Sequence, residues 1–145
     1  MMTEWMGQFL NEIMKKTDHS ELIWQSLRSY RQINSLIEEL PEAHGFYIDM
    51  YTNSVKVSDS YYLQKDEGAL FLLYIWHSSE RLDGEYYMFA RVNDNTDLQY
   101  LDFGEGYHRV ISQNLQSLAN TIHDQLHDHN GSHEQLLQFL HSIVD

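Results

Sequence analysis

The sequence predicts an α+β fold: an antiparallel meander sheet of four to five strands, with two N-terminal and two C-terminal helices packed mainly on one face. Three observations predict it. Apolar residues recur with helical spacing at both ends of the chain, they follow strand patterns in the middle, and turn-forming residues separate the segments. The chain has 145 residues, which is the usual length of one domain. We therefore expect a single domain over residues 1–145.

The first forty residues predict two helices. Apolar side chains in residues 5–14 recur on one helical face, and a second stripe runs through residues 22–40 for about five turns. Asp18 and Glu21 have the spacing of a capping box before this second stripe, and Pro41 follows it. We therefore expect a long second helix that stops at Pro41.

The middle of the chain predicts strands. Residues 46–51 and 55–58 alternate between apolar and polar side chains, which is typical of a β-hairpin. Residues 69–76 are continuously apolar, as expected of a central strand covered on both faces. Residues 86–92 predict a further strand and residues 98–103 a short fifth one.

The C-terminal part returns to helical spacing. Residues 110–126 carry one apolar stripe, Asn130 and Gly131 mark its end, and residues 132–144 carry a second stripe. This pattern predicts two consecutive helices.

Composition excludes several classes of protein. Nine Lys plus Arg against 22 Asp plus Glu give a net charge of −13, which disfavours direct binding to nucleic acid or anionic membranes. A hydrophobic content of 42% disfavours intrinsic disorder. The absence of cysteine excludes thiolate catalysis and disulfides. No apolar run approaches the ~20 residues of a membrane span and no signal-peptide pattern opens the chain, so we expect a cytoplasmic protein.

Tyrosine is abundant, with ten in the chain, and most of them fall in predicted strands. Packing across strands explains such residues as readily as a binding surface does. However, Tyr47, Asp49 and Tyr51 share one row, and the Tyr61–Tyr62 and Tyr86–Tyr87 pairs must send one ring to each side of the sheet. We therefore expect some rings to reach solvent, where tyrosine beside carboxylates forms a protein-binding face.

The negative charge is concentrated toward the C-terminus. Residues 97–145 contain seven acids and one base, and no lysine or arginine follows Arg109. A one-sided negative field favours a cationic target, whereas even acidity serves solubility alone. The residues expected to bind a partner are Tyr47, Asp49, Tyr51, Asp102, Glu105, Asp124 and Asp128.

Five histidines lie between His123 and His141. His123 and His127 are four residues apart, so they share one helical face and are candidates for a zinc pair, with His129 as a third ligand. A solvated structural role is the stronger interpretation, because no His-Glu-x-x-His motif is present. Asp102, Glu105 and His108 form another polar cluster, for which a connecting loop is a better interpretation than an acid–base site. We therefore expect no cofactor and no catalysis.

Three functions remain open. The first is a non-catalytic protein that docks on a basic surface of another protein. Most concretely, it is an inhibitor or immunity-type protein that mimics nucleic-acid phosphates and so blocks a nucleic-acid-binding enzyme. Such a complex should weaken with salt, and also at mildly acidic pH as imidazoles gain charge. The second is a small acidic chaperone or adaptor for a secreted partner, for which a homodimer and an exposed hydrophobic surface are expected. The third is a metal-dependent enzyme or regulator built on the histidine cluster.

Overall fold

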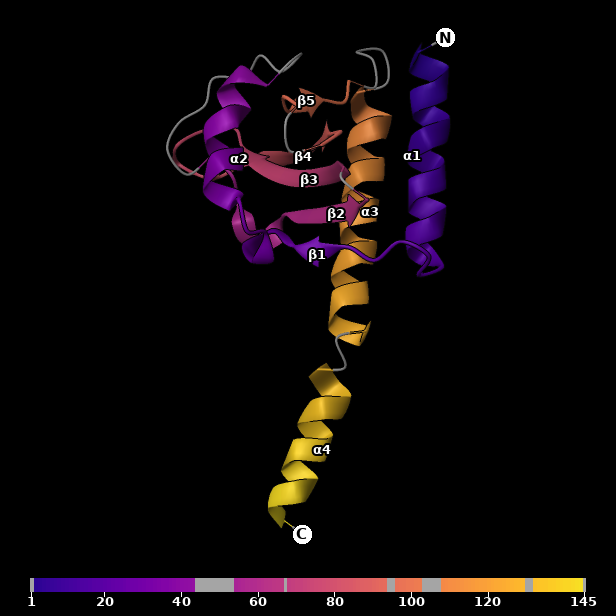
Figure 1. The fold of residues 1–145 in the computed structure, drawn as a ribbon, viewed down its shortest axis with the longest axis vertical. Helices are drawn as coiled ribbons and strands as arrows, with labels where there is room; N and C mark the ends of the chain where they lie inside the picture. The colour runs from indigo at the N-terminus through magenta and orange to yellow at the C-terminus, as the bar shows by residue number, and fades with distance from the viewer. Residues whose placement is uncertain are drawn as a thin grey trace.

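The computed structural model describes residues 2–43, 54–66, 68–93, 96–102, 108–129 and 132–144. These residues form four helices and a five-stranded antiparallel sheet, so the fold is α+β as predicted (Figure 1). The helices are α1 (Met2–Asp18), α2 (Ile33–Glu39), α3 (His108–His129) and α4 (Ser132–Val144), and the strands are β1 (Gln25–Ser26), β2 (Tyr61–Lys65), β3 (Gly68–Trp76), β4 (Gly84–Arg91) and β5 (Gln99–Tyr100).

The sheet is a meander with the order β1-β2-β3-β4-β5, and each neighbouring pair is antiparallel. Strands β3 and β4 form its longest ladder, from Ala69 opposite Arg91 to Trp76 opposite Gly84. The two edge strands are only two residues long. Short edge strands expose few unpaired backbone groups, which limits edge-to-edge association.

Both faces of the sheet are covered. Helices α1 and α3 lie side by side on one face, and the shorter α2 covers the other (Figure 1). Along β3, Leu72 faces α1 and α3 whereas Phe71 and Leu73 face α2, and all three side chains are fully buried. The continuous apolar run of residues 69–76 is therefore the central strand with two buried faces, as predicted.

The long second helix predicted for residues 22–40 is wrong. Residues 22–32 contain strand β1 and a 3₁₀ turn at Leu27–Ser29, and only α2 is helical in the predicted range before a 3₁₀ turn at Leu40–Glu42. Tertiary bonds hold the extended segment: the Leu27 N–H donates to the Ser60 carbonyl at 2.9 Å, next to the pairing of β1 with β2. Asp18 ends α1 and does not cap a second helix.

The predicted hairpin is also corrected where the structure describes it. Val55 makes an isolated bridge to Ile75, and Val57–Asp59 is a 3₁₀ turn instead of a strand. Residues 46–51 lie outside the described residues. The predicted strand at 98–103 is reduced to β5, with Phe103 outside the described residues.

The two C-terminal helices were predicted correctly, but they play different structural roles. Helix α3 packs on the sheet through Leu115, Leu118 and Ile122. Helix α4 continues beyond the sheet, and its C-terminal end points away from the rest of the fold (Figure 1). Within the described residues, we find no helix with the length and apolar character needed to cross a membrane.

Candidate functional site

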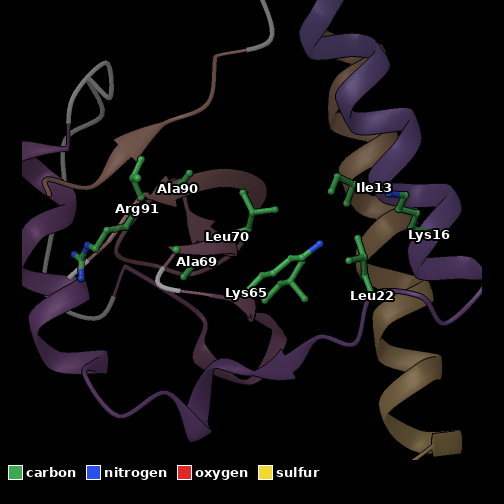
Figure 2. Close-up of a pocket in the computed structure, with 11 residues that line it drawn as sticks. Ile13, Lys16, Leu22, Lys65, Ala69, Leu70, Ala90 and Arg91 are labelled. Carbon is green, nitrogen blue, oxygen red and sulfur yellow. The ribbon is translucent and has the colours of Figure 1, made fainter. Parts of the chain in front are cut away.

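A groove of about 330 Å³ lies between the C-terminal half of α1 and the ends of strands β2, β3 and β4 (Figure 2). Aliphatic side chains form its floor, including Ile13 of α1, Leu22, Leu63 of β2 and Leu70 of β3. Lys16 of α1 and Lys65 of β2 stand on its opposite walls (Figure 2). The site therefore combines an apolar floor with two ammonium groups.

The turn between β2 and β3 sets the position of Lys65. Lys65 pairs with Gly68 across the turn, and Asp66 within it has a positive φ of 58°. A Cβ at Gly68 would lie 3.0 Å from the Val92 carbonyl oxygen, so a glycine permits the close approach of this turn to the end of β4. Lys65 consequently ends its strand at the rim of the groove, where it faces α1.

The groove is locally positive in an acidic protein. No Asp or Glu is among the described residues that line it. Arg91 contributes to the wall, but its guanidinium points to the opposite side of the sheet, where it pairs with Glu39 of α2 (Figure 2). Lys16 and Lys65 are both exposed, and neither pairs with a carboxylate of the described chain. Within the described residues, no carboxylate therefore competes with an anionic ligand for a direct ion pair with either ammonium group.

A second surface is the outer part of α4. Phe139, Leu140, Ile143 and Val144 form one helical stripe with exposed fractions of 60%, 46%, 65% and 83%. Four neighbouring large apolar side chains are unusual on the surface of a monomer, where such residues are normally scattered. This α4 stripe is suited to burial against another surface.

Carboxylates gather beside α2, on the other side of the sheet from α1 and α3. Glu39, Glu42 and Asp97 line a cavity of about 120 Å³ with Ala43 and Leu98. Because Glu39 already pairs with Arg91, the cavity carries partly neutralised charge.

The acids predicted to bind a partner are not brought together where the structure describes them. Asp102 is exposed just after β5, near the N-terminal end of α3, and Asp124 is exposed ~24 Å further along α3 at ~1.5 Å per residue. Tyr47, Asp49, Tyr51 and Glu105 lie outside the described residues, as does the side chain of Asp128. Asp102 and Asp124 therefore do not form one binding patch.

Two tyrosine pairs do send one ring to each face of the sheet, as predicted. Tyr61 and Tyr86 pack with α1 and α3, whereas Tyr62 and Tyr87 pack with α2. The expectation that such rings reach solvent is wrong for these four residues, which are at most 8% exposed, because helices cover both faces.

The hydroxyl groups of Tyr62, Tyr86 and Tyr87 are used internally. Tyr86 donates to the Asp59 carbonyl at 2.9 Å and Tyr62 donates to Gln25 Oε1 at 2.9 Å. Burial is the main cause that raises the pKa of Tyr86 and Tyr87, and the charge of Glu85 adds to the effect at Tyr87. These four rings are packing residues and not a binding surface.

The histidine cluster gains no support from the described side chains. His123 is exposed on α3, and the side chains of His127 and His129 lie outside the described residues. Within the described part of the chain, no three His, Asp or Glu side chains converge as a metal site would require. Glu105 and the side chain of His108 also lie outside it, so the loop interpretation of Asp102, Glu105 and His108 stays a prediction.

Sequence reasoning missed both the groove and the α4 stripe. Neither Lys16 nor Lys65 stands out in the sequence as a candidate site residue, and nothing in the sequence places these two residues opposite each other. The α4 stripe was visible as a periodic pattern, but such a pattern does not distinguish a core helix from an unpartnered one. Comparisons with protein-family models, curated proteins and solved structures found no match. The geometry of these two surfaces therefore has to support any functional proposal.

Proposed function

We propose that the protein is a non-catalytic acidic adaptor that docks on another protein through the α4 stripe. The observation that carries the proposal is the exposure of Phe139, Leu140, Ile143 and Val144 on a helix that extends away from the sheet (Figure 1). Amphipathic helices with anchors at this spacing bind by laying their apolar face in a groove of the partner. Burying one such side chain fully contributes about 1.5–3 kcal/mol, so burial of the stripe favours association.

The charge of the same region indicates the chemistry of the partner. The chain has no lysine or arginine after Arg109, while Asp124, Asp128, Glu134 and Asp145 add negative charge. An apolar groove with basic residues at its rim complements this helix, because rim charges steer association and apolar anchors hold the complex. The proposed partner is therefore a basic protein.

The exposed α4 stripe favours the adaptor over the phosphate-mimicking inhibitor. An inhibitor of a nucleic-acid-binding enzyme was expected to present tyrosine and carboxylate together, but the four strand tyrosines described above are buried. That narrower proposal now depends on Tyr47, Asp49 and Tyr51, which the structure does not describe.

Charge-matched variants of α4 test the adaptor proposal. Ile143→Glu places a charge in the stripe. Gln138→Glu places the same charge at an exposed position on the side of α4 that faces away from the stripe. Proteins crosslinked to the full chain in its source cells are identified by mass spectrometry, and the purified partner is then titrated with each variant. We expect Ile143→Glu to weaken binding by at least about tenfold and Gln138→Glu to leave it within about twofold.

The melting temperature of each variant shows whether the fold is intact. Because α4 extends away from the sheet, neither substitution should change it by more than a few degrees. A partner that binds Ile143→Glu as tightly as the original chain would contradict the proposal. A partner whose affinity does not fall with salt would contradict the basic character assigned to it.

A further inference from the structure

The groove between α1 and the sheet is separate from the α4 stripe and has a different chemistry. Its volume of about 330 Å³ falls at the lower end of the range of small-molecule sites, which is roughly 300–1,000 Å³. Small-molecule sites are mostly apolar with a few polar groups that fix orientation. Here Ile13, Leu22, Leu63 and Leu70 supply the apolar part, and Lys16 and Lys65 supply the polar part.

The two lysines face each other from independent elements. Lys16 lies in the last turns of α1, and Lys65 extends from the end of β2 toward that helix (Figure 2). An anion between them would receive charge-assisted hydrogen bonds from both walls at once. An elongated apolar group attached to the anion would lie along the aliphatic floor.

The composition of the lining gives the site its selectivity. Acids outnumber bases by 22 to 9 in the whole chain, yet no described carboxylate lines this groove. Asp66 follows Lys65 directly and Asp18 lies close to Lys16 in the sequence, but neither lines the site. Lys16 and Lys65 are therefore the charged groups whose ammonium ends the described lining offers to a ligand in the groove.

From this arrangement we propose that the groove binds a single-chain amphiphile with an anionic head group, a carboxylate or a phosphate monoester. The head group lies between the ammonium groups of Lys16 and Lys65, and the alkyl chain packs on Leu63 and Leu70. The proposal does not depend on the α4 stripe or on the adaptor function, because none of the four stripe residues is among those that line the groove.

Short amphiphiles of equal chain length test the proposal on the full protein. Octanoate, octyl phosphate and octylammonium are titrated separately below their micellar concentrations by isothermal titration calorimetry. We expect saturable binding of at least one of the two anions, and the one that binds more tightly identifies the head group. We expect no saturable binding of octylammonium, because its charge is repelled by both lysines.

Matched variants then locate the site. The double variant Lys16→Gln and Lys65→Gln should weaken binding of the anion by at least about tenfold. Lys15→Gln is the control, because Lys15 is exposed on the neighbouring position of α1 and does not line the groove. Ala90→Leu adds volume to the floor from β4, and should also weaken binding while both lysines remain.

Three results would overturn the proposal. They are the absence of saturable binding for both anions, binding of octylammonium as tight as that of the anions, and unchanged affinity in the double lysine variant. Far-ultraviolet circular dichroism and the melting temperature of each variant establish that it is folded, so that a loss of binding reports on the groove.

Discussion

The backbone N–H of Trp24 donates a hydrogen bond of 3.2 Å to Oε1 of Gln125, a residue 101 positions later on α3. The amide nitrogen of the same glutamine donates to the Leu22 carbonyl at 3.1 Å and to the Thr17 carbonyl at 3.3 Å. The Trp24 indole N–H completes the network by donating to Thr17 Oγ1 at 3.0 Å. Gln125 therefore fastens the segment between α1 and β1 to the C-terminal half of the fold.

Replacing Gln125 with leucine should destabilise the protein by about 2–4 kcal/mol. Leucine keeps most of the volume but leaves the buried Trp24 N–H without its acceptor, and two carbonyl groups lose their donor. Urea denaturation followed by tryptophan fluorescence measures the change. Gln113→Leu, an exposed position on the same helix, should stay within about 0.5 kcal/mol; equal effects at the two positions would show that the network contributes nothing.

The same network explains why the second helix was mispredicted. Residues 22–40 have helical spacing, but in the structure Trp24 and Leu27 are buried on opposite faces of the sheet. An extended segment at the edge of the sheet can place these two side chains on different faces. Gln125 is the acceptor that satisfies the Trp24 N–H in this conformation. The local pattern of residues 22–40 contains no information about Gln125, which lies about one hundred residues away. Periodicity therefore favoured a helix, whereas hydrogen bonds to distant residues hold the segment around Trp24 in an extended conformation.

Strong local signals were predictive elsewhere. The continuous apolar run of β3 and the long stripe of α3 are specified by their own residues, and the structure confirms both. The groove was not predictable, because Lys16 and Lys65 come to line one groove only in the folded chain, where α1 lies beside the ends of β2 and β3. The exposure of α4 was not predictable either. An apolar stripe shows that one face of a helix is apolar, but it does not show whether another element covers that face.

Two glycines should respond oppositely to alanine. At Gly84, an added Cβ would lie 2.7 Å from the Ile75 carbonyl oxygen and would overlap the Tyr74 ring, so Gly84→Ala should cost about 1–3 kcal/mol. At Gly7, within α1, nothing lies within 4 Å of the added Cβ, and alanine should stabilise the helix by about 0.5–1 kcal/mol. Chemical denaturation of both variants checks the contrast, and a stabilising Gly84→Ala would contradict the close β3–β4 pairing.

The stability of the protein should depend on Glu39, because this residue pairs with the buried guanidinium of Arg91. Arg91 is 6% exposed, it pairs with Glu39 of α2, and its Nε has no hydrogen-bond partner in the described structure. Glu39→Gln removes the counter-charge of a buried cation and should cost about 1–3 kcal/mol, a discounted range because the carboxylate is 39% exposed.

A double-mutant cycle separates this pair from the surrounding packing. Glu39→Gln should cost much less in an Arg91→Met background, because no buried cation then remains unpaired. Glu38→Gln, at the exposed neighbouring position on α2, is the control and should have little effect. Additive effects of Glu39→Gln and Arg91→Met in denaturation experiments would show that the two side chains do not interact energetically.

Stability should decrease in alkali because of the buried tyrosines. Burial raises the pKa of Tyr86, with smaller contributions from Tyr61, Asp59 and Tyr74, and burial and the charge of Glu85 raise that of Tyr87. The unfolded chain releases a phenolic proton near pH ~10, whereas the folded chain keeps it. The stabilising contribution is therefore complete below about pH 10 and declines as the pH rises above it, by up to about 1.4 kcal/mol per pH unit for each such tyrosine.

Urea denaturation between about pH 8 and 11.5, with tyrosinate absorbance recorded for folded and unfolded protein, measures this dependence. Tyr86→Phe removes one titrating group together with its hydrogen bond to the Asp59 carbonyl. The variant should be less stable than the original chain by about 1 kcal/mol at pH 8, and its stability should fall less steeply above pH ~10. Parallel stability curves for the two proteins across this range would show that Tyr86 ionises equally readily in the folded and unfolded states, and that its burial does not control the alkaline response.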